Sequence, residues 1–126
     1  MNLLRWVLTA SLFVPYLAPA AESDADALVR LRAEIIEMIG TPNCTNVVYC
    51  RLLALGSLPC GGPSEYLAYA GTRTGNTGLL ETKASEYGFL QDELRKGGKD
   101  PATCTVLPVP KLACVNSRCA LVNPGR

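Results

Sequence analysis

The sequence predicts a single α+β domain in which a small antiparallel sheet and two helices are held together by disulfides. Two segments repeat apolar residues at helical spacing, and the segments between and after them alternate in the manner of strands. Six cysteines follow an apolar leader, an arrangement typical of a small exported protein. These cysteines are Cys44, Cys50, Cys60, Cys104, Cys114 and Cys119.

Residues 1–20 have the features of a secretory signal peptide. One basic residue, Arg5, precedes an apolar run that Pro15 interrupts, and the segment ends in small residues that suit a signal peptidase. A retained membrane anchor needs about 20 apolar residues, and this run is shorter. We therefore expect cleavage before Ala21, which leaves residues 21–126 as one disulfide-bonded domain in the periplasm or outside the cell.

The charge of the mature chain argues against some partners. Without Arg5 the chain keeps 11 basic and 11 acidic residues, so it has no net charge. A neutral surface gives no counterion-release drive toward nucleic acid and little attraction to anionic lipid. We expect a monomer that binds no nucleic acid, does not insert into a membrane after cleavage, and has another exported protein as its partner.

The first predicted helix starts after Ser23, which suits an N-cap position. Apolar residues then recur at helical spacing until Gly40 and Pro42 end the run. The buried stripe consists of Leu28, Leu31, Ile35 and Met38.

From residue 46 to 55 the apolar period changes to two, which predicts a strand. Both faces of this strand are largely apolar, so we expect it to be central or covered. Val48, Cys50, Leu52 and Ala54 form one face, and Val47, Tyr49, Arg51, Leu53 and Leu55 form the other.

The block Cys60-Gly61-Gly62-Pro63 predicts a tight turn, because glycine permits positive φ and proline fixes the exit. A short extended segment, 66–70, follows, and a polar, glycine-rich link leads to the second helix. Gly97-Gly98 should close that helix. Its apolar stripe is Leu80, Ala84, Tyr87, Leu90 and Leu94.

The C-terminal segment predicts a hairpin with a two-residue turn at Asn116-Ser117. That register places Cys114 opposite Cys119, and Leu112 opposite Leu121, all on one face. Two cysteines directly opposite are close enough to bond to each other. They could equally turn inward to meet Cys44 and Cys50, and the sequence does not choose between these pairings.

The apolar stripes of the three strongest elements predict the hydrophobic core. The predicted core residues are Leu31, Ile35, Val48, Leu52, Leu80, Tyr87 and Leu90.

Metal binding and catalysis are both unsupported by the sequence. The cysteine spacings differ from the short paired spacing of structural zinc sites, and the chain has no histidine. A hydrolase would need a base other than histidine, and candidates such as Ser85 with Glu81, or the carboxylates of Glu65, Glu81 and Glu86, show no spacing that builds a cleft. We therefore expect no enzymatic activity, no metal and no cofactor.

The loop around the Gly-Gly-Pro turn is the candidate binding site. A disulfide at Cys60 would hold its backbone ready for a partner and so lower the entropic cost of binding. The alternative is a purely structural turn in which Tyr66 or Tyr69 packs into the sheet. The candidate binding residues are Gly61, Gly62, Pro63, Ser64, Glu65 and Tyr66.

The cysteine pattern resembles that of an uncharacterised family of small exported bacterial six-cysteine proteins. The resemblance covers nearly all of the mature chain and includes the Cys60-Gly61-Gly62-Pro63-x-x-Tyr66 block and the terminal Cys114-x4-Cys119 hairpin. It implies a bacterial envelope or secreted protein, and it implies no functional residue. The chain departs from the family where Gly75-Asn76-Thr77 precedes the second helix and where Asn116-Ser117 forms the hairpin turn.

These observations favour a non-catalytic binding module, and specifically an inhibitor of an exported hydrolase. Such an inhibitor needs a rigid cross-linked loop and no acid–base machinery. The alternative is a structural or assembly component of the cell envelope, and an enzyme that uses carboxylates or lysine comes third. A convex rigid loop would favour the inhibitor, a broad apolar patch would favour the assembly component, and a pocket with clustered carboxylates would favour the enzyme.

Overall fold

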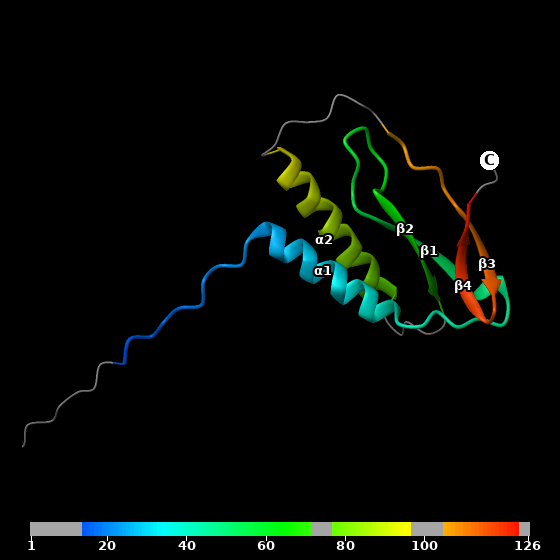
Figure 1. Cartoon of the computed structure of the whole chain (residues 1–126), viewed down its shortest axis with the longest axis horizontal. Coiled ribbons are helices and arrows are strands. Elements are labelled where there is room, and N and C mark those ends of the chain that lie inside the picture. Colours follow the sequence, from blue (N-terminus) through cyan, green and yellow to red (C-terminus); the bar gives the residue numbers. More distant parts are fainter. Residues whose placement is uncertain (1–13, 72–76, 97–104, 124–126) are drawn as a thin grey trace, which may run out of the picture.

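The structure, a computed structural model, describes residues 14–71, 77–96 and 105–123. Within these residues the predicted α+β class is confirmed (Figure 1). The strands form two separate two-stranded antiparallel sheets instead of one. The elements are α1 (Asp24–Ile39), the short 3₁₀ helix η1 (Val47–Tyr49), β1 (Cys50–Leu55), β2 (Glu65–Ala70), α2 (Thr77–Lys96), β3 (Lys111–Val115) and β4 (Arg118–Val122).

The β1–β2 hairpin lies between the two helices and the β3–β4 hairpin (Figure 1). Its helix-facing side supplies Leu53, Leu55 and Tyr69 to the main hydrophobic core. Its other side supplies Cys50 and Ala70 to a second, smaller core against β3–β4. Each face of β1 therefore packs against a different element, and the predicted covering is partial, since Arg51 on one face and Ala54 on the other are exposed.

The first helix begins and ends where the sequence predicts. The hydroxyl of Ser23 accepts a hydrogen bond from the backbone N–H of Asp26 at 3.2 Å, which is N-cap geometry. Gly40 ends the helix at φ 56°, and its N–H donates to the carbonyl of Ile36. Two stripe residues, Leu31 and Ile35, are buried.

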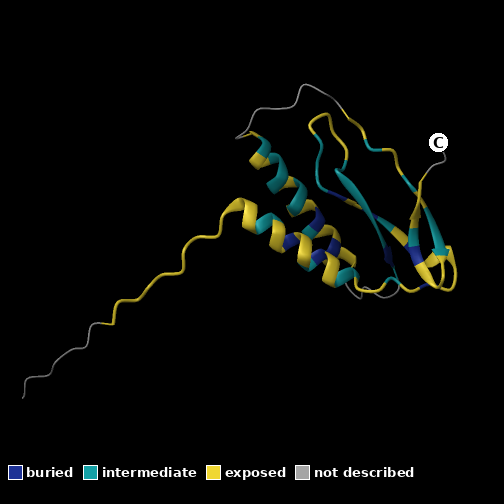
Figure 2. Cartoon of the chain, viewed as in Figure 1, coloured by how far each residue is buried: buried dark blue, intermediate teal, exposed yellow. Residues whose placement is uncertain are grey.

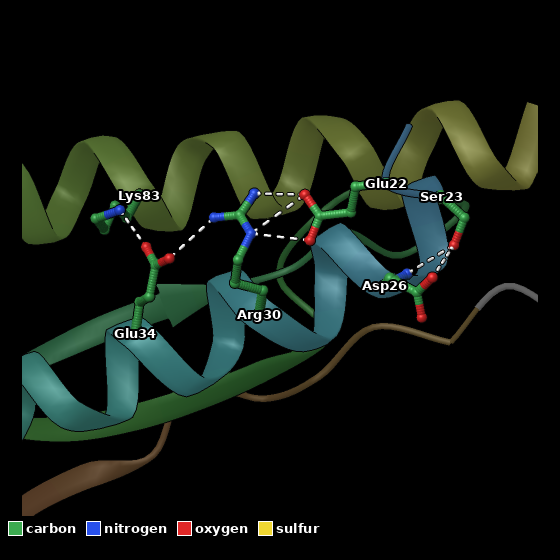
Figure 3. Close-up of polar contacts among 6 residues, drawn as sticks. All are labelled: Glu22, Ser23, Asp26, Arg30, Glu34 and Lys83. Carbon is green, nitrogen blue, oxygen red and sulfur yellow. Dashed lines mark hydrogen bonds and ion pairs between the residues drawn. The ribbon is translucent and has the colours of Figure 1, made fainter. Parts of the chain in front are cut away.

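A chain of ion pairs joins the two helices (Figure 3). Arg30 binds Glu22 at 3.0 Å and Glu34 at 2.9 Å, and Glu34 also binds Lys83 of α2. Hydrogen bonds from Lys83 and then Arg30 lower the pKa of Glu34. Because these side chains are partly exposed, we expect the ion pairs to contribute little to stability.

The prediction for Val48 is wrong, since this residue is 61% exposed. Residues 47–49 form the 3₁₀ turn η1, because the side chain of Asn46 accepts the N–H of Val48 at 3.1 Å. The strand therefore starts only at Cys50.

The remaining predicted core residues divide into two groups. Leu31, Ile35 and Leu80 are buried, and Tyr87 packs against the main core while partly buried. Leu52 and Leu90 are half-buried.

Replacing Leu31 with Ala should lower the free energy of unfolding by about 3 kcal/mol, because the side chain is fully buried and its removal leaves a cavity. Val29 lies on the same helix but is 72% exposed, so Val29→Ala should change stability by less than about 0.5 kcal/mol. Urea unfolding of both variants measures the difference. Equal effects would show that the assigned buried face of α1 is incorrect.

The C-terminal hairpin has the predicted register, with Cys114 opposite Cys119 and Leu112 opposite Leu121. Asn116 and Ser117 both have positive φ, at 49° and 61°, as a two-residue mirror-image turn requires. The two cysteines do not bond to each other. They turn inward and form the Cys44–Cys114 and Cys50–Cys119 disulfides, so they meet Cys44 and Cys50 as the sequence also allowed.

Candidate functional site

The candidate loop joins β1 to β2 over residues 56–64, and residues 59–62, which we call the loop tip, are exposed. Gly61 and Gly62 have φ values of 92° and 81°, and a Cβ on either would meet nothing within 4 Å. The N–H of Leu58 donates to the carbonyl of Gly62, and the N–H of Gly61 donates to that of Leu58. The loop's own backbone therefore sets the shape of the tip.

The base of the loop is attached to the last turns of α2. The side-chain oxygen of Gln91 accepts a hydrogen bond from the backbone N–H of Ser57 at 2.7 Å. The carboxylate of Asp92 accepts one from the hydroxyl of Ser57 at 2.7 Å. The guanidinium of Arg95 donates to the carbonyl of Ser57 and pairs with Asp92. Every polar group of Ser57 is thus bound by α2, which holds the loop against the helix.

The contact between Ser57 and Asp92 has the composition of a nucleophile and a base, but its electrostatics suit an anchor. The hydrogen bond from Ser57, followed by that from Arg95, lowers the pKa of Asp92. A carboxylate with a lowered pKa is a weak base for removing a hydroxyl proton. We therefore interpret this pair as a structural attachment of the loop.

The lowered pKa of Asp92 predicts how its contribution to stability depends on pH. Because the folded pKa lies below the unfolded value of about 3.9, the contribution is present above that value and is lost as pH falls through the folded pKa. Asp92→Asn should therefore destabilise the protein at neutral pH. The gap in melting temperature between the variant and wild type should narrow below about pH 4. A gap that is constant from neutral pH to pH 2 would exclude this role for the carboxylate.

The six predicted binding residues lie in two different environments. Gly61 and Gly62 are at the exposed tip, and Pro63 is half-buried. The side chains of the other three contact the body of the protein. Ser64 donates its hydroxyl to the carbonyl of Leu55, Glu65 binds Arg32 of α1 through two hydrogen bonds of 3.0 and 3.1 Å, and Tyr66 lines a 150 Å³ cavity with Leu107, Pro108, Pro110, Leu121 and Asn123.

The cysteines form a compact sulfur cluster beside the second core. The Sγ atoms of Cys44, Cys50 and Cys119 lie within 4.8 Å of one another. Each is bonded in a disulfide, so in this oxidised form none is a thiolate ligand for a metal. Cys60 is also disulfide-bonded, and Cys104 lies outside the described residues.

A groove of about 540 Å³ between α2 and β1 was not predicted from the sequence. Glu81, Ser85 and Phe89 lie on its helix side, and Leu52 and Ala54 lie on its strand side. One signal could have indicated it: Phe89 is a large aromatic residue placed off the apolar stripe of α2, and it is 66% exposed.

No described helix has the length and apolar character needed to span a bilayer. Comparison of the chain with protein-family models, curated proteins and solved structures finds no match.

Proposed function

We propose that the protein is an exported, non-catalytic binding module that presents its loop tip to a partner protein, and specifically an inhibitor of an exported hydrolase. One observation carries the proposal: the tip is exposed while the loop is held by its own backbone hydrogen bonds, by α2 and by the disulfide at Cys60.

A loop held in this way favours binding for a physical reason. A flexible loop loses conformational entropy when a partner orders it, and a loop that is already ordered avoids most of that loss. The glycines at the tip leave backbone groups uncovered by side chains, so a partner can approach the main chain closely. The lack of net charge on the mature chain fits a protein partner better than a nucleic acid.

Export is supported by two features. Disulfides form and persist mainly in oxidising compartments, and the described residues contain two complete bridges. Residues 14–22 are exposed and run away from the folded domain, where a peptidase could reach them (Figures 1 and 2). Both features agree with cleavage before Ala21 and with the resemblance to small exported bacterial proteins, which we retain as part of this proposal.

Crosslinking of the mature protein to a native envelope fraction tests the proposal. Wild type should capture a discrete partner protein, and Pro59→Arg should lose it, because the substitution places a long charged side chain at the exposed tip. Val29→Arg, on the exposed face of α1, is the matched control and should capture the partner normally. The proposal is wrong if folded Pro59→Arg captures the same partner as wild type, or if wild type captures none. If the captured partner is a hydrolase that wild type does not inhibit, the inhibitor assignment alone is wrong.

A second candidate, a structural component of the envelope, is favoured by an apolar patch on η1. Val47, Val48 and Tyr49 are exposed side by side, and the exposed Val115 lies on β3, which packs beside η1. Such a patch is typical of an assembly contact. Val48→Glu should abolish capture if this patch is the interface and leave capture intact if the loop tip is.

A further inference from the structure

We propose that the outer edge of β1 and the groove beside α2 bind an extended peptide segment that carries a basic side chain. The segment would join the β1–β2 sheet as an additional strand. This site adjoins the loop tip at Gly62, which also lines the groove, but the proposal does not depend on the tip binding anything.

The hydrogen-bonding phase of β1 shows which backbone groups face outward. The carbonyl of Tyr49 accepts a hydrogen bond from the N–H of Gly71 at 2.9 Å, so the backbone groups of Tyr49 face the β2 side. Arg51, Leu53 and Leu55 follow at every second position, so their N–H and C=O groups also face β2. Because strand residues alternate, Leu52 and Ala54 direct their N–H and C=O groups to the opposite edge. No other strand pairs with this edge in the part of the chain that the structure describes. Such a row of outward-facing groups is a template for one more strand.

The groove gives this edge a wall on one side. Leu52 and Ala54 line it from β1, and Glu81, Ser85 and Phe89 line it from α2. The helix passes close to the end of β1 at Gly88, where a Cβ would lie 3.4 Å from the carbonyl oxygen of Gly56, the residue that follows the strand. A chain added to the edge would therefore place alternate side chains against α2.

The charged residues that line the groove indicate which peptide side chains would face α2. Glu81 also lines a neighbouring cavity of about 280 Å³ with Arg51 and Tyr69, so this acidic residue borders both the groove and that cavity. Arg51 donates instead to the carbonyls of Val48 and Cys50. The basic residues of α2 also pair elsewhere: Lys83 with Glu34, Arg95 with Asp92, and Lys96 with Glu93.

Two features of the site thus define its ligand. The unpaired edge requires an extended backbone, since only a strand can match its alternating donors and acceptors. The carboxylate of Glu81 favours a lysine or arginine facing α2, and the exposed ring of Phe89 favours an apolar residue on the same face of the added strand. A peptide that carries a basic residue and an apolar residue at alternate positions, both facing α2, should therefore fit better than one with an acidic residue in place of the basic one.

NMR titration of the ¹⁵N-labelled mature protein with acetyl-Thr-Val-Thr-Lys-Thr-Val-Thr-amide tests the site. The amide signals of Leu52 and Ala54 should shift and saturate. The peptide with Glu in place of Lys should bind roughly tenfold more weakly, and Glu81→Lys should reverse that preference. Ala54→Pro removes an outward N–H but no β1–β2 hydrogen bond, so it should abolish binding while the hairpin stays intact. Pro59→Arg should bind the peptide normally, which separates this site from the loop tip.

A peptide with N-methyl groups on alternate residues keeps the test independent of protein folding, because it lacks the donors that strand addition needs. It should not bind. The proposal is overturned if this peptide binds as well as its parent, if the Lys and Glu peptides bind equally, or if the shifts lie away from Leu52 and Ala54. It is also overturned if the parent peptide does not bind, or if sedimentation shows that a second copy of the chain already covers this edge.

Discussion

Replacing Cys50 and Cys119 together with Ala should lower the free energy of unfolding by about 4 kcal/mol. The bridge joins β1 to β4, and the Cys44–Cys114 bridge still closes a loop of nearly the same length when it is removed. The unfolded chain therefore gains only the freedom of the short segments between the two bridges, and the rest of the loss comes from the second core. Both cysteines are also buried, at 3% and 6% exposure, and they form part of the second core. Guanidinium unfolding followed by circular dichroism measures the loss.

The exposed Val115 of β3 supplies the control for this experiment. Val115→Ala alters the same hairpin without touching a bridge, and its effect should stay below about 0.5 kcal/mol. A double-cysteine variant that unfolds within about 1 kcal/mol of wild type would mean that the bridge does not hold the hairpin to the sheet.

Gly56→Ala should cost about 3 kcal/mol or more, because two penalties combine there. Gly56 has φ of 78°, which is strained for any residue with a Cβ. A Cβ at this position would also lie 1.9 Å from the hydroxyl oxygen of Ser64 and 2.6 Å from the side-chain oxygen of Gln91. Relief of these contacts would break the hydrogen bonds that attach the loop to α2. Thermal melting and urea unfolding of the variant measure the cost.

Gly61→Ala separates the two penalties. Gly61 also has positive φ, but a Cβ there meets nothing within 4 Å, so this variant should lose only about 1 kcal/mol. Adding Ser64→Ala to Gly56→Ala removes the nearest oxygen and should recover part of the loss. If the two glycine variants are equally stable, the close contact at Gly56 has no energetic consequence.

The sequence predicted elements whose signals are local. The cap at Ser23, the end at Gly40 and the hairpin turn at Asn116 each depend on residues only a few positions apart. The predicted strand over 46–55 was wrong at its start for a related reason. The apolar residues at 47–49 fit a strand and a 3₁₀ turn equally well. The hydrogen bond from the N–H of Val48 to the side chain of Asn46 selects the turn.

The site was less predictable because its contacts join residues far apart in the sequence. The Gly-Gly-Pro block indicated the loop, but Glu65 lies against α1 because Arg32, 33 residues earlier, binds it. The attachment of Ser57 to Asp92 spans 35 residues. The division into two sheets has the same origin, since strand pairing is set by how whole hairpins pack and not by the pattern within one strand.

The central claim is that the mature chain is an exported domain closed by disulfides, and intact mass after alkylation without reductant tests it most directly. Protein purified from its native host should begin at Ala21 or within two residues of it, and it should gain no label. Peptide mapping should then recover Cys44 linked to Cys114 and Cys50 linked to Cys119. Labelling of two or more cysteines, or a chain that retains residues 1–20, would contradict the claim.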